Sequence, residues 1–155
     1  MSNSDLLKEL DDKFKLMQRE LGFKSTFKQI DEIFFVSDHI LHSRYVSSFL
    51  SRQICSRIVE TYMGWNNYLH NLVMSSPGYM IQMNESKMLS EEDKKICLKI
   101  MAQAMVIVSG NSLIGLTKDK KEEASFIDGA VEFWNNTYRP QIEKLTRKIN
   151  DGWKK

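Results

Sequence analysis

Two long stretches of the chain contain no lysine, arginine, aspartate or glutamate, and they constrain the fold more than any other feature. They run from Thr61 to Asn84 and from Ile100 to Thr117, and a membrane-spanning helix needs roughly 20 apolar residues. Both stretches carry amides and serines near their middle, and such polar groups are costly in hydrocarbon. We therefore expect a soluble domain with an uncharged interior and no membrane span.

The hydrophobic residues recur with the spacing of an α-helix. The first stripe, with 3-4-3-4 spacing, consists of Leu7, Leu10, Phe14, Met17 and Leu21. It predicts a helix that begins near a cap at Ser4 and ends at Gly22. Thr26 and Gln29 have the spacing of a capping box, which predicts a short second helix to about Phe35.

A longer apolar arc occupies residues 37 to 73. Its apolar positions fall on one side of a helix, but globular helices average about 11 to 12 residues. We therefore expect two helices, divided near Ser47 and Ser48 or at Gly64. A turn should follow at residues 75–78, where serine, proline and glycine cluster.

The next segment has the character of a central core helix. Ser90 followed by three acidic residues is a favourable helix start. From Ile96 to Ser109 only Lys99, Gln103 and Ser109 are polar, so neighbouring helices should cover this segment on several sides. Gly110 and Asn111 should loosen or end it.

The C-terminal region should form a last amphipathic stretch that starts within residues 119–123 and is interrupted at Pro140. Its later apolar stripe comprises Ile142, Leu145, Ile149 and Trp153. No segment shows the alternating pattern and hairpin turns of β-strands. The expected fold is all-α, and the length of 155 residues suits a single domain over residues 1–155.

Charge and cysteine content narrow the class of protein. Lysine and arginine total 22 against 20 acidic residues, a net charge of +2, which is too small a basic excess to indicate a nucleic-acid partner. Cys55 and Cys97, the only cysteines, form neither a disulfide framework nor a zinc motif. These features, and the lack of a signal peptide at the N-terminus, favour the cytoplasm.

No motif predicts an enzyme or a metal site. His39 and His42 share a helical face, but no carboxylate follows at ligand spacing, and neither they nor His70 belongs to a metal-binding motif. Cys55 and Cys97 lie in apolar surroundings, where a thiol is normally inert. We therefore predict a non-enzymatic protein without a metal.

The interior favours either a plain core or an apolar cavity. The chain has 9 methionines and 16 aromatic residues, which can fill a helical core or line an adaptable pocket. Ser43, Ser47 and Thr61 lie inside the apolar arc of residues 37–73, with His39 and Arg57 at its edge. A guanidinium there could bind the carboxylate of a ligand, or it could reach water while its stem packs.

The whole chain resembles the heme-less globin-type sensor domains of Bacillus sporulation histidine kinases, and especially their free-standing plasmid-encoded homologues that inhibit sporulation. The resemblance extends over essentially all 155 residues. It is carried by stretches such as His39–Tyr45, Trp65–His70 and Phe133–Tyr138.

This resemblance implies a globin-like fold without heme, a hydrophobic tunnel for a fatty acid, and a polar chamber for a halide such as chloride or for water. The implied role is to sequester a signal that a related kinase would read. Independently, no histidine occurs in residues 79–92 or anywhere after His70, so heme iron would lack its usual axial ligand. The candidate ligand-binding residues are Arg57, His39, Ser43, Ser47, Ile54, Ile58, Thr61, Trp65, Tyr79, Met83, Met101 and Met105.

The alternative is a helical adaptor that acts through a dimer or a partner helix. The face from Leu7 to Leu21 and the stripe from Ile142 to Trp153 are the two candidate interfaces. A homodimer is compatible with either reading.

Overall fold

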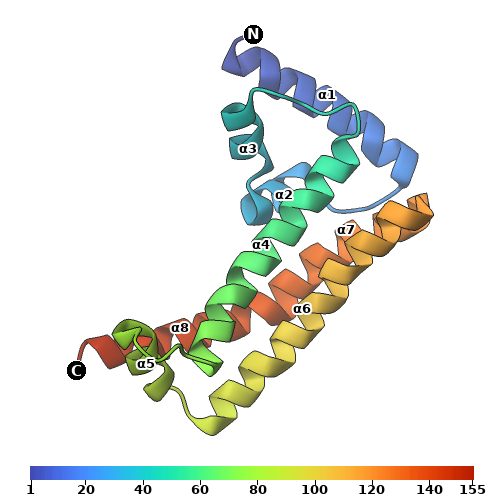
Figure 1. Ribbon diagram of the computed structural model, residues 1–155. Coiled ribbons are helices and arrows are strands. Elements are labelled where there is room, and N and C mark those ends of the chain that lie inside the picture. The colour runs from blue at the N-terminus through green and yellow to red at the C-terminus, as the bar shows by residue number, and fades with distance from the viewer. The chain divides into compact units, whose positions relative to one another are not determined.

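The computed structural model describes residues 1–155, and every regular element in it is a helix, so the all-α prediction is confirmed (Figure 1). The elements are α1 (Asn3–Leu21), α2 (Phe27–Phe34), α3 (Val36–Ser43), α4 (Leu50–Val73), α5 (Met80–Lys87), α6 (Glu91–Thr117), α7 (Lys120–Phe133), a π-helical turn (Trp134–Tyr138) and α8 (Arg139–Trp153).

The chain forms two compact units, which are described separately below. Unit 1 consists of Met1–Thr61 and Ser109–Val131, and unit 2 consists of Tyr62–Val108 and Glu132–Lys155. The expectation of one domain over residues 1–155 stays a prediction.

The start of α1 lies two residues earlier than the sequence predicts. Ser2, rather than Ser4, is the N-cap: its hydroxyl accepts from the amide of Asp5 at 3.1 Å, and the Asp5 carboxylate accepts from the Ser2 amide at 3.2 Å. This reciprocal pair satisfies two amides that the first turn leaves without helical partners. The helix ends at Gly22, as predicted, with a positive φ of 85° that glycine adopts without strain.

Two further helix starts were predicted correctly from their capping residues. Thr26 and Gln29 exchange side-chain and backbone hydrogen bonds of 2.9 and 3.2 Å ahead of α2. Ser90 and Asp93 do the same at 3.0 and 3.1 Å ahead of α6. Each motif lies within one helical turn, so local chemistry is sufficient to position these ends.

The predicted division of the apolar arc near Ser47 and Ser48 is confirmed. The chain leaves α3 at Arg44, which has a φ of 62°, and α4 begins at Leu50. Gly64, the other proposed break, lies inside α4 without interrupting it. A glycine in a helix costs only about 1 kcal/mol relative to alanine, so packing over the length of α4 can offset that cost.

Two expectations for the core helix are wrong. Gly110 and Asn111 do not end α6, which continues to Thr117; the Asn111 side chain is instead held by a 2.8 Å hydrogen bond from Arg52. Nor is α6 covered on several sides. Ile100 and Ala104 are buried, but only 17% of its most apolar 18-residue window is buried.

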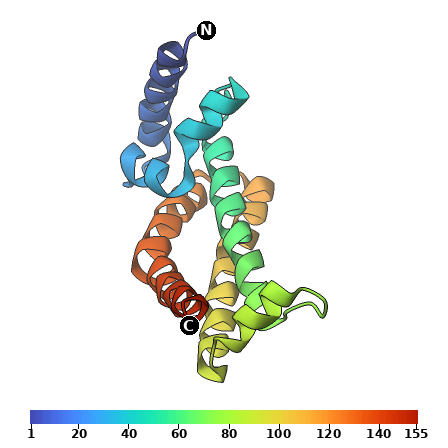
Figure 2. The ribbon, with the colours of Figure 1, turned by 90° about the vertical axis from the view of Figure 1, so that its left-hand side faces the viewer.

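In unit 1, α1 lies beside α3, and α2 also contacts α3 (Figures 1 and 2). Phe14 of α1 makes edge-to-face contacts with Phe23 and Phe27, at ring-centre distances of 5.6 and 5.0 Å. The inner positions of the first stripe, including Leu10 and Met17, are buried. These positions of α1 are therefore part of the core of unit 1, and a role of this face in the adaptor alternative stays a prediction.

Asp128 of α7 fixes the segment between α1 and α2. Its carboxylate accepts hydrogen bonds from the amide of Lys24 at 2.9 Å, the amide of Ser25 at 2.8 Å and the hydroxyl of Ser25 at 2.6 Å. Burial by itself would raise the pKa of Asp128, but the hydrogen bonds from Ser25 and Lys24 outweigh it, and the pKa lies below its ordinary value of 3.8. The charged carboxylate is thus stabilised in the folded state.

We expect acid to weaken the fold through this carboxylate. Because its pKa is lower in the folded than in the unfolded chain, its contribution is complete above the unfolded value near 3.8 and is lost as the pH falls through the folded value. Urea unfolding at pH 7, 5 and 3 should show a large gap between wild type and Asp128→Asn at pH 7 that narrows at pH 3. Burial would also raise the pKa of Asp93, but hydrogen bonds from Lys148 and Ser90 outweigh it and lower that pKa. Because Asp93 is still present in the Asp128→Asn variant, the variant should retain some acid sensitivity. A gap independent of pH would contradict this assignment.

In unit 2, the predicted interruption at Pro140 is confirmed as a π-helical turn, Trp134–Tyr138, directly before α8. Proline has no amide hydrogen to donate to the preceding turn, and a single π turn is a usual way to accommodate such a defect. Tyr138 in this turn is fully buried, so the altered helical geometry directs an aromatic ring into the core.

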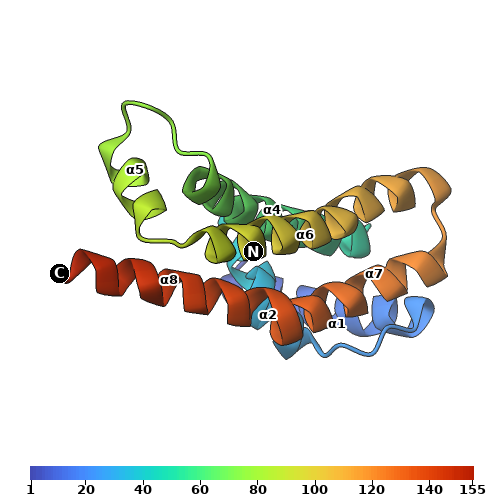
Figure 3. The ribbon, with the colours of Figure 1, turned by 90° about the horizontal axis from the view of Figure 1, so that it is seen from below.

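The C-terminal apolar stripe also packs within the protein. Ile142, Leu145 and Ile149 are buried in unit 2. Trp153 donates its indole N–H to Glu85 at 3.0 Å, where α5 lies over the end of α8 (Figure 3). Leu7 in the first face and Trp153 in the second remain 39% and 49% exposed, and a role of either face in a partner interface stays a prediction.

Candidate functional site

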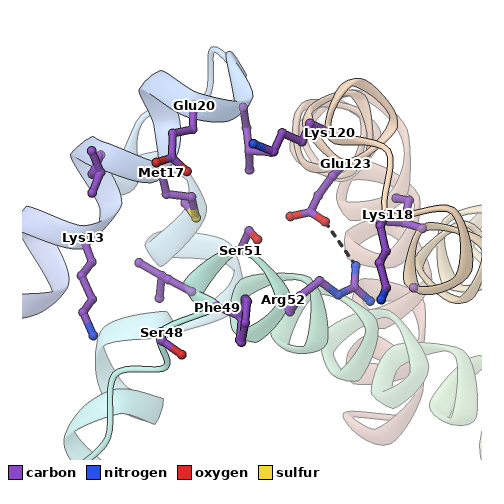
Figure 4. Close-up of a pocket in the computed structure, with 15 residues that line it drawn as sticks. Lys13, Met17, Glu20, Ser48, Phe49, Ser51, Arg52, Lys118, Lys120 and Glu123 are labelled. Atoms are coloured by element: carbon purple, nitrogen blue, oxygen red, sulfur yellow. Dashed lines mark ion pairs between the residues drawn. The ribbon is translucent and has the colours of Figure 1, made fainter.

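Unit 1 contains an open pocket of about 800 Å³, formed by α1, the start of α4 and the turn that joins α6 to α7 (Figure 4). Small-molecule pockets in proteins usually have volumes of about 300 to 1,000 Å³. The lining residues are Lys13, Leu16, Met17, Glu20, Leu21, Ser48, Phe49, Leu50, Ser51, Arg52, Ile114, Gly115, Lys118, Lys120 and Glu123.

The wall of the pocket is largely apolar. Met17, Leu50 and Ile114 are buried and belong to the core of unit 1. Leu16 and Phe49 are exposed, as large apolar side chains at the mouth of an open pocket would be. A ligand with a hydrocarbon part could therefore remove water from Leu16 and Phe49, whereas the three buried side chains are already shielded from it.

Charged groups surround one part of this wall. Four cationic residues line the pocket, Lys13, Lys118, Lys120 and Arg52, against two carboxylates, Glu20 and Glu123. Lys13 already pairs with Glu9 at 3.0 Å, whereas Lys118 and Lys120 are exposed and form no ion pair. The pocket thus has an excess of positive charge, which favours an anionic ligand.

Arg52 is held at the pocket by contacts with two other residues. One terminal nitrogen, Nη2, donates to the side chain and the carbonyl of Asn111 at 2.8 and 3.3 Å. The other, Nη1, lies 3.5 Å from Glu123 Oε2; it is buried and has no hydrogen-bond partner. Figure 4 shows the two side chains pointing toward each other at one side of the pocket. The guanidinium is therefore fixed in place while retaining unused donor capacity.

Glu123, the acidic partner of Arg52, is buried, with 7% of the residue exposed. A buried carboxylate needs a cationic partner, and Arg52 is that partner.

The two cysteine thiols are buried. Cys55 lies one turn further along α4, where burial, with a smaller contribution from Glu123, raises its pKa to about 12. Burial likewise raises the pKa of Cys97 to about 11, so both thiols stay protonated at neutral pH.

Arg57, the head-group residue predicted from sequence, uses its guanidinium within the protein. Its Nε donates to the carbonyl of Phe34 at 3.1 Å, and its Nη1 pairs with Glu60. Thr61 donates its hydroxyl to the Arg57 carbonyl at 2.9 Å. These contacts agree with the alternative in which the arginine stem packs and its head reaches the surface.

The other predicted residues of unit 1 have mixed environments. Ile54 and Ile58 are completely buried, whereas His39 and Ser47 are half-buried and Ser43 is exposed. The Ser47 hydroxyl accepts from the amide of Phe49 at 3.0 Å, which helps to form the turn before α4. These residues serve the core and the turn in this structure.

The remaining predicted residues belong to unit 2. Trp65 and Met101 are half-buried, and the carbonyl of Met101 accepts a hydrogen bond from Asn66. Tyr79, Met83 and Met105 are exposed. The predicted set is thus divided between the two units, and its role in binding stays a prediction.

None of the twelve predicted residues lines the pocket of unit 1. Sequence reasoning missed Arg52 and Glu123 because their partners lie 59 and 71 residues away along the chain. The cluster of charges that begins at Lys118, directly after the uncharged stretch, was the one local signal that could have indicated this end of α6.

No group of three or more histidine, cysteine, aspartate or glutamate side chains is placed to hold a metal ion. One helix, α6, is long and apolar enough to cross a membrane by length and composition alone. Core helices of soluble proteins can meet that criterion too. The length and composition of α6 therefore do not assign it a role.

The sequence matches no protein-family model, and comparisons with curated proteins and with solved structures give no match. Only the residues and their geometry therefore indicate a function.

Proposed function

We propose that this protein is a non-enzymatic binding protein whose pocket in unit 1 takes an amphiphile with an acidic head group, of the fatty-acid class. The observation that carries the proposal is Arg52, with a buried Nη1 that makes no hydrogen bond at the edge of an apolar pocket. A ligand carboxylate would accept the bond that Glu123, at 3.5 Å, leaves unmade.

The remaining charges of the pocket agree with that polarity. Lys118 and Lys120 would offset the repulsion between the ligand carboxylate and Glu123, because both lysines line the same pocket. The hydrocarbon chain would cover Leu16 and Phe49, the exposed apolar side chains of the pocket. The head group would set the orientation of the ligand, and the apolar wall would supply most of the affinity.

The energetics are compatible with useful binding. Transfer of about a dozen methylenes from water contributes on the order of 10 kcal/mol before costs, at about 0.8 kcal/mol each. Immobilising the ligand and the side chains that contact it removes a large part of this. An affinity in the micromolar range needs a net value of about 8 kcal/mol, which this sum can reach.

Calorimetric titration with dodecanoic acid should detect binding to the purified protein, and Arg52→Ala should weaken it by roughly 10- to 100-fold. A hydrogen bond to a charged group contributes about 1.5 to 3 kcal/mol, which corresponds to that range. Native mass spectrometry of untreated protein provides a second measurement, since a bound acyl species should be retained.

The matched control is Arg57→Ala, which removes an arginine of the same helix that the protein already uses. It should leave the affinity for dodecanoic acid unchanged. Leu16→Glu places a carboxylate at the exposed edge of the pocket and should weaken binding without loss of helical circular dichroism. Binding that is insensitive to Arg52→Ala but lost in Arg57→Ala would move the head-group site to the position first predicted from sequence.

The resemblance to the heme-less globin-type sensor domains adds a biological role to this proposal. It adds a globin-like arrangement without heme, a halide or water chamber, a cytoplasmic location, and a role as a sensor or decoy that inhibits sporulation by sequestering the signal of a related kinase. These elements rest on the resemblance alone, and the titration above tests the ligand class on which they depend.

A further inference from the structure

The pocket of unit 1 holds a carboxylate of its own at the place proposed for the ligand head group. Glu123 lies in the first turn of α7 and is buried, whereas Glu20 of α1, the other carboxylate of the pocket, is exposed. Figure 4 shows the Glu123 carboxylate facing the Arg52 guanidinium, while Glu20 extends from α1. A negative charge is therefore already buried where an acidic ligand would bind.

In the free protein, the surroundings of Glu123 favour its charged form. Nη1 of Arg52 lies 3.5 Å from its Oε2 atom. The amides at the start of a helix also carry a partial positive charge, and Glu123 lies in that turn of α7. Cys55 of α4 interacts with Glu123 as well, but this thiol is neutral because burial raises its pKa.

An acidic ligand would change these surroundings. Its head group would accept a hydrogen bond from Arg52 Nη1, the same atom that faces Glu123. It would thus compete with Glu123 for the guanidinium and bring a second negative charge within a few ångströms of the first. Two carboxylates that share a site do not both stay charged, because their repulsion is relieved when one of them takes up a proton.

The other charged groups of the pocket offset this repulsion only in part. Lys118, which follows α6, and Lys120 of α7 are exposed, and exposed charges are screened by water and salt. Lys13 of α1 is already paired with another carboxylate, and Glu20 adds a further negative charge. No histidine lines the pocket, so Glu123 is the protein group that can relieve the repulsion by taking up a proton.

We propose that the pocket binds its acidic ligand together with one proton, which Glu123 takes up from the solvent. This inference rests on the proposed function of the pocket. The ligand carboxylate stays charged and pairs with Arg52, and the protonated Glu123 donates its O–H to that carboxylate in a charge-assisted hydrogen bond. Because a proton is consumed, binding should weaken as the pH rises, by at most about tenfold per pH unit.

Calorimetric titration with dodecanoic acid measures this proton directly. In buffers of different ionisation enthalpy at pH 7, the observed heat changes with the buffer in proportion to the number of protons taken up. Wild type should take up at least about half a proton per ligand, and its affinity should fall by roughly five- to tenfold between pH 6.5 and pH 8.

Two variants assign the proton to one carboxylate. Glu123→Gln should abolish the uptake and the pH dependence. At pH 8 it should bind dodecanoic acid more tightly than wild type does, because its amide is uncharged and can donate to the ligand. Glu20→Gln removes the exposed carboxylate of the same pocket and is the matched control, so it should leave the uptake unchanged.

Titration with 1-dodecanesulfonate separates the protein from the ligand as the holder of the proton. A sulfonate stays charged over this pH range, so wild type should show the same uptake with it. Binding without proton uptake, uptake that persists in Glu123→Gln, or uptake confined to dodecanoic acid overturns this proposal and leaves the binding function standing. Absence of binding to wild type at every pH overturns the proposed function itself, and this inference with it.

Discussion

Replacing Tyr62 by alanine is expected to lower the free energy of unfolding by about 3 to 5 kcal/mol, the usual cost of removing a large buried aromatic side chain. Tyr62 is completely buried in unit 2. Its ring lies 5.1 Å from that of Tyr138 and 5.9 Å from those of Phe133 and Trp134. Alanine would leave a cavity among three rings, two of which belong to the π-helical turn while Phe133 directly precedes it, so little relaxation can fill it.

The matched control is Tyr62→Phe, which keeps the ring and removes only the hydroxyl. Burial raises the pKa of Tyr62 well above its ordinary value, so the hydroxyl is neutral and its loss should cost about 1 kcal/mol. Urea unfolding followed by circular dichroism measures both variants. Equal effects of the two substitutions would show that ring packing does not determine the stability of this cluster.

Replacing Asn66 by alanine is expected to cost about 2 to 4 kcal/mol, because it breaks a buried polar network. Asn66 is only 5% exposed. Its Oδ1 accepts from the Tyr138 hydroxyl at 2.6 Å, and its Nδ2 donates to the Met101 carbonyl at 3.2 Å. The alanine variant leaves the Tyr138 hydroxyl buried without its acceptor, which adds the cost of desolvation to the loss of the bond.

A double-mutant cycle isolates this contribution. In a Tyr138→Phe background no hydroxyl is left unsatisfied, so Asn66→Ala should cost about 1 to 3 kcal/mol less than it does in wild type. Chemical unfolding of the four proteins provides the coupling free energy. If the cost of Asn66→Ala is the same in both backgrounds, the hydrogen bond to Tyr138 does not contribute to stability.

The ends of several helices could be predicted because their determinants are local. Thr26 with Gln29 and Ser90 with Asp93 each act within one turn, and Gly22 ends α1 through its own backbone freedom. The cap of α1 was placed two residues too late because Ser2 and Ser4 have similar capping propensities. Only the reciprocal bond from Asp5 distinguishes them.

The burial of α6 could not be predicted from its composition. An apolar helix indicates that much of its surface should avoid water, but it does not indicate which face packs within the chain. The structure buries Ile100 and leaves Leu98 exposed, although the two residues are equally apolar. The same limit applies to the arginines of α4: Arg52 meets Glu123 at the pocket, and Arg57 meets Glu60 and the Phe34 carbonyl.

By itself, the sequence determined the helical class, most helix ends and the interruption at Pro140, because capping, periodicity and the missing amide of proline act over a few residues. Only the tertiary structure decided which stripe is covered, which guanidinium faces a pocket and where that pocket lies. These features depend on contacts between residues dozens of positions apart, such as Arg52 with Glu123 and Asn66 with Tyr138, and no local pattern encodes such pairings.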